Sequence, residues 1–398
     1  MAGSGLSAGR LARVREIAAR HVEGGSLPGL VTVVSRRGES HIEAVGAIGV
    51  GGDRPMQRDT IFRISSMTKP VTAAAALILV EECVLRLDDP IDRLIPELAG
   101  VRVLRRPDGE VGDTVPARRP ISLRDLLTFR LGTGHSMAAG ALPIDAAMQT
   151  LELGAGPPQP DVAPPPDEWL RRLGSVPLLY QPGEAWLYNT GSDVLGVLIA
   201  RASGQPFETF LRERIFEPLG MVDTGFAVPA DRLHRLPPQY FTDPHSGELA
   251  VFDESNGQWS RPPAFQSGAA GLVSTADDFL AFGQMLLGGG RLGTQRILSR
   301  VSVEAMTADQ LTPQQRLAGA PYLGNRGWGF GVAVQTRRDG PSGVPGQFGW
   351  DGGLGTGWTS DPREDKVTIL LTQTAWSSPS PPPVLLDFRT SAYQAIDD

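Results

Sequence analysis

The chain has 398 residues, 41% of them hydrophobic and 20% charged, and its formal net charge at pH 7 is −7. These values predict a folded protein of two domains or one large one, with an ample core. The acidic balance gives no reason to expect nucleic acid or an anionic membrane surface as a partner. The single cysteine, Cys83, excludes an intrachain disulfide and a cysteine-based zinc site, and we expect it to be a small buried apolar residue.

Residues 1–25 form a polar tail followed by an amphipathic helical pattern that ends at two glycines. They lack the apolar stretch of a signal peptide, and no later segment reaches the roughly 18 apolar residues of a membrane-spanning helix. We therefore expect a cytoplasmic protein that does not enter a membrane. Residues 28–50 then predict two strands joined by a turn.

Residues 63–80, RISSMTKPVTAAAALILV, combine a serine, a lysine and an apolar helical run. Pro70 has no N–H and would clash with the carbonyl of Ser66, defects that a helix tolerates only in its first turn. The helix is therefore predicted to begin near Ser66, with Ser65 or Ser66 as its N-cap. Lys69 follows Ser66 by three residues and so lies on the same helix face.

The lysine in this segment is unusual, because Lys occurs only at positions 69 and 366 and arginine supplies the other positive charges. Burial and a helix N-terminus both favour a neutral amine, which an arginine cannot provide. Lys69 beside the hydroxyl of Ser66 thus predicts a lysine-activated serine nucleophile. The alternative is an N-capped core helix whose lysine extends to water. Lys366, beside Arg363 and Asp365, is predicted to lie in a turn.

The middle of the chain is mainly helical, and strand patterns return near its end. Ser122 and Asp125 predict a variant of the capping box, Ser274 or Thr275 is expected to cap a later helix, and residues 154–166 form a Pro-rich loop. Strands at both ends with helices between them predict an α+β fold with one antiparallel sheet built from both termini. The predicted domains are an α/β domain of residues 1–85 and 265–398, and a mainly helical domain of residues 86–264.

Three segments in this order resemble the successive active-site motifs of serine β-lactamase-related hydrolases: SSMTK (65–69), WLYNTGSDVLG (186–196) and FGWDGGLGTGWTSDP (348–362). That group includes class C β-lactamases, DD-peptidases and the family VIII carboxylesterases, which this chain resembles most. The segments 124–128 and 268–282 add to a resemblance that runs from about residue 28 to residue 396. It implies the β-lactamase/penicillin-binding-protein-like fold, an antiparallel sheet flanked by helices plus a helical domain.

The resemblance also implies roles for residues of the first two motifs. Ser66 would be the nucleophile and Lys69 its base. Tyr188 stands in a Y-x-N pattern whose third position is Thr190 here, and its phenol, held partly ionised, would act as base or proton shuttle. Asp193 is the nearest polar substitute for the missing asparagine. A tyrosine packed beneath a helix with a satisfied hydroxyl is the alternative for Tyr188.

In the third motif, Trp350, Asp351 and Gly352 stand where relatives have K-T-G or H-T-G. The resemblance implies that the next N–H, that of Gly353, forms an oxyanion hole with the N–H of Ser66. A Gly-rich turn between strands is the alternative. The expected substrate-binding residues are therefore Trp350, Asp351, Gly352 and Asp193. An indole and an aspartate offer no cation to the carboxylate of a β-lactam, which favours neutral esters as substrates.

The predicted activity is hydrolysis of short-chain carboxylic esters through an acyl-enzyme on Ser66, with a small-molecule ester as partner and neither cofactor nor metal. A β-lactamase or D-alanyl peptidase-like amidase and a catalytically silent binding protein are the alternatives. The G-x-S-x-G pattern at residues 5–9 lies in a polar tail with no strand before it, so we reject it as a nucleophile elbow. The five histidines show no metal-ligand spacing, although one would suffice for a Ser-His-Asp triad. The sequence gives no prediction of the oligomeric state.

Overall fold

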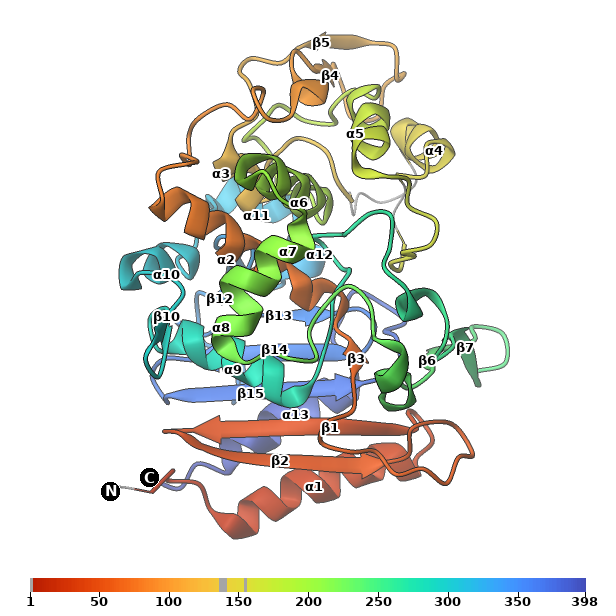
Figure 1. Cartoon of the computed structure of the whole chain (residues 1–398), viewed down its shortest axis with the longest axis vertical. Coiled ribbons are helices and arrows are strands. Elements are labelled where there is room, and N and C mark those ends of the chain that lie inside the picture. Colours follow the sequence, from red (N-terminus) through yellow and green to blue (C-terminus); the bar gives the residue numbers. More distant parts are fainter. Residues whose placement is uncertain (1–2, 136–141, 154–155) are drawn as a thin grey trace.

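The computed structural model describes residues 3–135, 142–153 and 156–398. Within them the main sheet is antiparallel and has the strand order β11-β12-β13-β14-β15-β1-β2 (Figure 1). Because β1 pairs with β15, from Leu30↔Thr372 to Arg36↔Lys366, the sheet joins the two ends of the chain as predicted. Its strands are β1 (Gly29–Arg36), β2 (Glu39–Gly46), β11 (Arg326–Trp328), β12 (Ala333–Gln335), β13 (Phe348–Gly352), β14 (Thr356–Asp361) and β15 (Lys366–Thr372).

Both faces of the central strands are buried, and alternate side chains enter two different cores. Val33 and Ile369 pack with the core that contains α2 (Thr68–Glu81) and α9 (Ala276–Leu287). On the other face, Leu30, Val34 and Leu370 pack with α1 (Ala8–Glu23) and α13 (Pro383–Gln394). The sheet is therefore the middle layer of three, and Figure 1 shows α13 behind its strands and α1 below β2.

The helical part lies above the sheet in Figure 1, and α2 runs between the two. In α3, Ser122 and Asp125 form the predicted capping box, and Thr275 caps α9 through the N–H of Asp278. The remaining helices are α3 (Leu123–Leu127), α4 (Pro143–Thr150), α5 (Pro166–Gly174), α6 (Thr190–Ser203), α7 (Phe207–Leu211), α8 (Glu217–Leu219), α10 (Arg300–Met306), α11 (Pro313–Ala318) and α12 (Ala320–Leu323).

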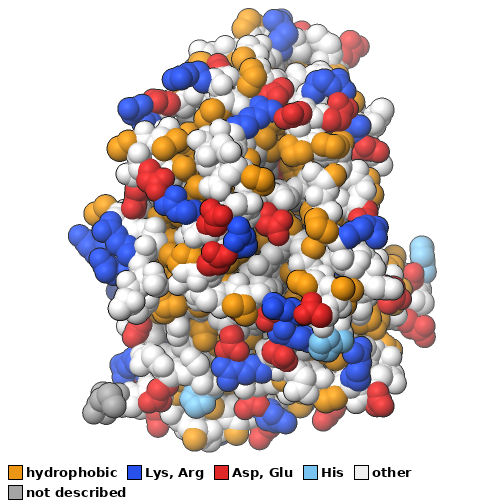
Figure 2. Space-filling view, viewed as in Figure 1, with side chains coloured by type: hydrophobic (Ala, Val, Ile, Leu, Met, Phe, Trp, Pro, Cys, Tyr) orange, Lys and Arg blue, Asp and Glu red, His pale blue; other side chains and the backbone are white. Residues whose placement is uncertain are grey.

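Short strand pairs join loops around this framework. They are β3 (Phe62–Arg63) with β8 (Val273–Ser274), β4 (Arg102–Leu104) with β5 (Thr114–Pro116), β6 (Gln239–Thr242) with β7 (Leu249–Asp253), and β9 (Arg291–Leu292) with β10 (Gln295–Arg296). The surface carries acidic and basic side chains interspersed over the visible face, without one dominant sign (Figure 2). No helix in the described ranges combines the length and the apolar character needed to cross a bilayer.

Two sequence predictions outside the candidate site are wrong. Cys83 is exposed, because α2 ends at Glu81 and the chain turns there with a positive φ of 58° at the cysteine. Lys366 is the first residue of β15 rather than part of a turn, and only 1% of it is exposed. Its ammonium lies 2.8 Å from the centroid of the Tyr393 ring, so an aromatic side chain of α13 covers it.

Candidate active site

The serine of the first motif lies in a tight turn before α2. Residues Ser65–Met67 form a single 3-10 turn, and the α-helix begins at Thr68. Ser65 has a φ of +46°, a conformation that costs a non-glycine residue about 1–2 kcal/mol. The prediction that Ser65 or Ser66 caps the helix is wrong, since neither hydroxyl makes a capping bond; the Ser66 Oγ is instead bonded to Lys69.

Lys69 is completely buried and points back at the serine. Its Nζ lies 2.8 Å from Ser66 Oγ and donates to the carbonyl of Ala269 at 2.8 Å. Burial lowers the pKa of Lys69 from 10.5 to about 7, against the attraction of the Asp193 carboxylate. A large fraction of the amine is therefore neutral at pH 7, and a neutral amine can accept the proton of the hydroxyl beside it.

The carbonyl that receives Lys69 is fixed by Asp193, which lies in the first turn of α6. Asp193 Oδ1 accepts hydrogen bonds from Ser267 Oγ (2.6 Å) and from the N–H of Ala269 (3.1 Å). Thr72 Oγ1 donates to the carbonyl of Gly268 at 2.7 Å and so ties the same segment to α2. Asp193 thus lines the cavity and holds the Lys69 acceptor in place.

Tyr188 lies above Lys69, whose Nζ is 4.5 Å from the centroid of the phenol ring. A γ-turn centred on Asn189 (φ 82°) and a backbone bridge to His135 hold the tyrosine in position. Its hydroxyl interacts with Ser66 and accepts a hydrogen bond of 2.8 Å from Trp350 Nε1.

The prediction that this phenol is partly ionised is wrong. Burial raises the pKa of Tyr188 above its usual value, and the hydrogen bonds to Ser66 and Trp350 offset only part of that rise. Because the pKa of Lys69 is itself lowered to about 7, only part of the amine is charged near pH 7 and able to stabilise a phenolate. Tyr188 is a neutral phenol, suited to pass a proton on rather than to serve as a standing anionic base.

The third motif brings the end of β13 against the serine turn. Gly352 is packed so closely that a Cβ would lie 2.3 Å from the carbonyl oxygen of Ile64, and only glycine fits there. Gly352 therefore allows this approach and is not among the residues that line the cavity, contrary to its predicted substrate contact. The neighbouring Gly353 does line the cavity together with Ser66.

The N–H groups of Ser66 and Gly353 have no backbone acceptor in the described part of the chain. The carbonyls of the same two peptide units are tied down, since that of Ser65 accepts from Thr68 N–H and that of Gly352 from Gly355 N–H (3.0 Å). The planes of both peptide units are thus fixed before any ligand arrives. Such preorganised donors are what an oxyanion hole requires.

Asp351 does not offer a free charge to the cavity. Its neighbour Trp350 points to the side of Tyr188, whereas the Asp351 carboxylate, 5% exposed, meets Arg389 of α13 at 2.5 Å and Arg326 at 3.7 Å. Asp351 nevertheless lines the cavity, so its predicted contact with substrate stays a prediction. A cation that the motif did not indicate also stands near Trp350, because the guanidinium carbon of Arg326 lies 4.9 Å from the centroid of its ring.

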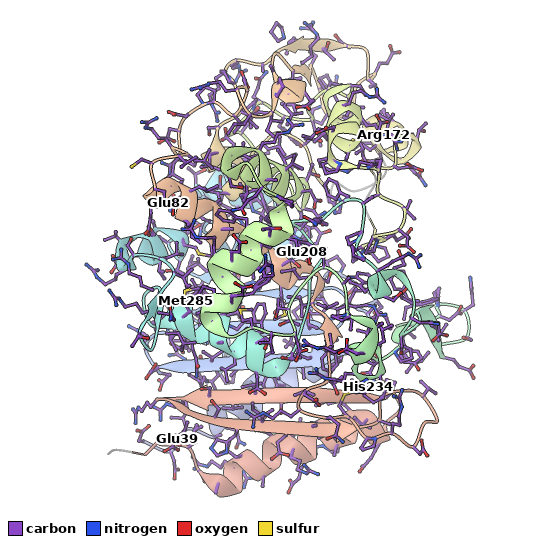
Figure 3. All side chains as sticks on the ribbon, viewed as in Figure 1. Glu39, Glu82, Arg172, Glu208, His234 and Met285 are labelled. Carbon is purple, nitrogen blue, oxygen red and sulfur yellow. The ribbon has the colours of Figure 1, made fainter. Side chains whose placement is uncertain are left out.

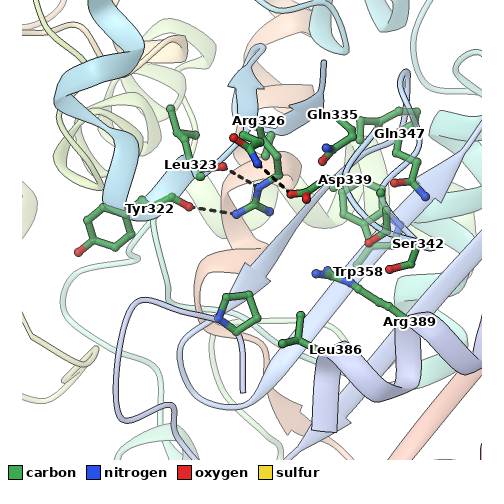
Figure 4. Close-up of a pocket in the computed structure, with 18 of the residues that line it drawn as sticks. Tyr322, Leu323, Arg326, Gln335, Asp339, Ser342, Gln347, Trp358, Leu386 and Arg389 are labelled. Carbon is green, nitrogen blue, oxygen red and sulfur yellow. Dashed lines mark hydrogen bonds between the residues drawn. The ribbon is translucent and has the colours of Figure 1, made fainter. Parts of the chain in front are cut away.

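Ser66, Tyr188, Asp193, Trp350 and Gly353 line one cavity of about 970 Å³. Its walls are mainly apolar and come from the Pro-rich loop, α5, the β6–β7 hairpin and the loop after β15, with Pro157, Pro158, Pro160, Trp169, Phe241, Phe252, Phe265, Leu354 and Trp376. A second cavity of about 340 Å³ lies beyond Tyr322 and Arg326, which line both (Figure 4). In the described ranges no three His, Cys, Asp or Glu residues gather as metal ligands.

Sequence reasoning missed His135, Arg326 and the donor function of Trp350. His135 lines the cavity, and burial together with Lys69 lowers its pKa to about 4, so the imidazole is neutral near pH 7. His234, by contrast, lies on the segment after α8 at the lower right of Figure 3. No local sequence pattern marks His135, Arg326 or the donor function of Trp350, because each depends on contacts between segments far apart in the chain.

Comparison with known proteins extends these observations. The family model described as Beta-lactamase matches residues 14–383. Protein Rv1367c of Mycobacterium tuberculosis is 40% identical over 375 residues, covering 92% of this chain and 89% of that protein. Esterase EstB of Burkholderia gladioli is 32% identical over 385 residues, with 92% and 91% covered.

Among solved structures, EstCE1, described as a hydrolase with promiscuous acyltransferase activity, matches with a TM-score of 0.78 at 25% identity, over 96% of this chain and 98% of that one. The LovD6 mutant of simvastatin synthase from Aspergillus terreus matches with a TM-score of 0.80 at 25% identity, over 98% and 95%. These relatives support a hydrolase or acyltransferase of β-lactamase fold, and the resemblance found in the sequence is confirmed. The chain belongs to the Beta-lactamase family.

Proposed function

We propose that this protein is a serine carboxylesterase that cleaves short-chain carboxylic esters through an acyl-enzyme on Ser66. The observation that carries the proposal is the buried Lys69 amine, with a pKa lowered to about 7, at 2.8 Å from Ser66 Oγ. An amine in this state can take the serine proton at neutral pH, which is what an unactivated serine lacks. The esterases among the relatives support the same class of reaction.

In the proposed first half-reaction, Ser66 Oγ attacks the ester carbonyl while its proton passes to Lys69. The developing oxyanion accepts hydrogen bonds from the N–H groups of Ser66 and Gly353. Tyr188, placed between Ser66 and Trp350, delivers a proton to the leaving alcohol oxygen as the C–O bond breaks, and the Lys69 ammonium returns a proton to Tyr188, so that both groups end neutral. The alcohol departs and the acyl group stays on Ser66.

In the second half-reaction, water attacks the acyl-enzyme carbonyl and gives its proton to Lys69, directly or through Tyr188. The oxyanion of the tetrahedral intermediate accepts hydrogen bonds from the same two N–H groups. Collapse of the intermediate returns the proton to Ser66 Oγ and frees the carboxylic acid. The proposed reaction uses the residues named, the small-molecule ester and one water molecule. Asp193 and Trp350 take part by holding the carbonyl of Ala269 and the hydroxyl of Tyr188.

The proposal is tested by mixing the protein with p-nitrophenyl butyrate and following p-nitrophenol release, beside labelling with a fluorophosphonate probe. We expect ester turnover and covalent labelling at Ser66, with both lost in Ser66→Ala. A chromogenic cephalosporin measured in parallel separates the amidase alternative. Turnover of the cephalosporin that equals or exceeds that of the best ester would assign the site to β-lactams, and the absence of labelling would indicate a binding protein.

A further inference from the structure

Arg326 places a cation at the wall of the active-site cavity. It begins β11, and its guanidinium lies against the indole of Trp350. Arg326 Nε donates to the carbonyl of Leu323 (3.2 Å) and Nη2 to that of Tyr322 (3.0 Å), as Figure 4 shows. These two bonds use a minority of the five guanidinium donors, so the group is oriented but not saturated.

The charge of Arg326 is only partly balanced. Asp351 is its acidic neighbour, and both oxygens of that carboxylate lie nearer to Arg389, at 2.5 and 3.5 Å, than the 3.7 Å that separates it from Arg326 Nη1. One carboxylate shared by two guanidiniums leaves a net positive charge. Burial lowers the pKa of Arg326, yet an arginine stays protonated at neutral pH. A desolvated and incompletely paired cation is stabilised by any anion that reaches it.

The other charged groups of the cavity are already engaged. Glu152 pairs with Arg172 at 2.5 Å, and Asp193 accepts bonds from Ser267 and from the Ala269 N–H. Among the described residues that line the cavity, Arg326 is the one with a permanent positive charge. An anionic group of a ligand therefore has one clear destination in this cavity.

The position of Arg326 tells which part of an ester would carry the anion. Two neighbours of Arg326, Tyr322 and Trp350, also contact Tyr188. Tyr322 stacks on Tyr188 with ring centroids 4.4 Å apart, and Trp350 donates to the Tyr188 hydroxyl. In the proposed reaction Tyr188 protonates the leaving oxygen, which places the alcohol part on this side. Resting on that proposed function, we propose that Arg326 binds a carboxylate carried by the alcohol part, so that the substrates are esters of hydroxy acids.

The test compares 3-acetoxybenzoate with 3-acetoxybenzamide, which share the acetyl group and the ring and differ in the charge of one substituent. We expect wild-type kcat/KM to be about 10-fold or more higher for the carboxylate, since a charge-assisted bidentate bond is gained. Arg326→Gln should remove most of this preference, mainly through KM, and should change the amide by less than about 3-fold. Comparing each ester between variants cancels differences in leaving-group reactivity.

Arg337→Gln is the matched control, because Arg337 is exposed, contacts Asn325 beside Arg326 and changes the net charge equally. It should leave the preference unchanged. Arg326→Lys keeps the charge without the planar fork and should retain part of the preference, which covers the case in which Arg326→Gln does not fold.

A wild-type preference for the amide, or equal losses on both esters in Arg326→Gln, would overturn the role of Arg326 while leaving the esterase intact. No Ser66-dependent hydrolysis of either ester by the wild type would instead overturn the proposed function and this inference with it.

Discussion

Replacing Lys69 by methionine should abolish activity and, at low pH, stabilise the fold. Lowering the pKa of a buried lysine from 10.5 to about 7 corresponds to a cost of about 4–5 kcal/mol for holding the amine in the folded chain. Methionine has a similar length and carries no charge, so it escapes this cost. It loses the hydrogen bonds to Ser66 and Ala269, at about 1 kcal/mol each. The net expectation is a gain of about 2–3 kcal/mol in the free energy of unfolding at pH 6.

The pH dependence of this gain has a definite sign. Below pH 7 the amine is protonated in the folded and unfolded chains alike, so the whole cost is present in the wild type. Between about pH 7 and 10.5 the unfolded chain binds more protons than the folded one, and wild-type stability rises with pH. The advantage of Lys69→Met should therefore shrink above pH 7 and be close to zero at pH 9. Urea unfolding at pH 6 and pH 9 measures both differences.

Lys366→Met provides the matched control. Lys366 is equally buried, its pKa is also lowered to about 7 by burial, and its Nζ has no hydrogen-bond partner among the described residues. Lys366→Met should raise the free energy of unfolding by about 4 kcal/mol at pH 6, which is more than Lys69→Met gains, and it should keep ester hydrolysis. Lys69→Met should lose about 10²-fold or more of kcat/KM, and the wild-type value should rise with pH through about 7.

Two results would refute this reasoning. If Lys69→Met hydrolyses esters at the wild-type rate, the amine is not the base. If Lys69→Met is destabilised at pH 6 while Lys366→Met is stabilised, Lys69 is held by interactions worth more than its desolvation, and its pKa is not depressed.

Three further predictions concern the groups around the amine. Ser66→Ala should lose nearly all ester turnover and Ser65→Ala far less, as measured by initial rates; a dead Ser65→Ala would shift the nucleophile by one residue. Tyr188→Phe should cut kcat by about 10²-fold while the protein stays folded, with its melting temperature lowered only by the loss of the Trp350 hydrogen bond. Retained turnover would make Tyr188 a packing residue. Trp350→Phe should keep the packing on Trp328 but lose the donor to Tyr188, lowering kcat about 10-fold with little change in KM; an unchanged kcat would show that Tyr188 needs no such support.

The features that the sequence predicted correctly are those set by neighbouring residues. The spacing of Ser66 and Lys69 places both on one helix face because three residues span almost one helical turn. The capping box of Ser122 and Asp125 forms within four residues, and alternation along β1 and β15 reflects the two faces of every strand. The order of three such motifs along the chain was enough to identify the family.

The chemistry of the site depends on contacts that the sequence does not encode locally. The pKa of Lys69 is lowered because the surrounding core, with the segment of Ala269 200 residues away, excludes water from the amine. The same desolvation keeps Tyr188 protonated, against the prediction from the motif. Burial of this kind is a sum over the whole fold, so no pattern of nearby residues reports it.

The third motif shows the same difference between local sequence and tertiary structure in two adjacent residues. Trp350 and Asp351 were both expected to face the substrate; both line the cavity, but side chains on a strand alternate, so they have different neighbours. Those neighbours are set by α13, whose Arg389 binds the Asp351 carboxylate, and by Tyr188, whose hydroxyl accepts the Trp350 N–H. The packing of distant elements on the two sides of β13, rather than the motif, thus determined that the cavity faces an indole and the cation of Arg326.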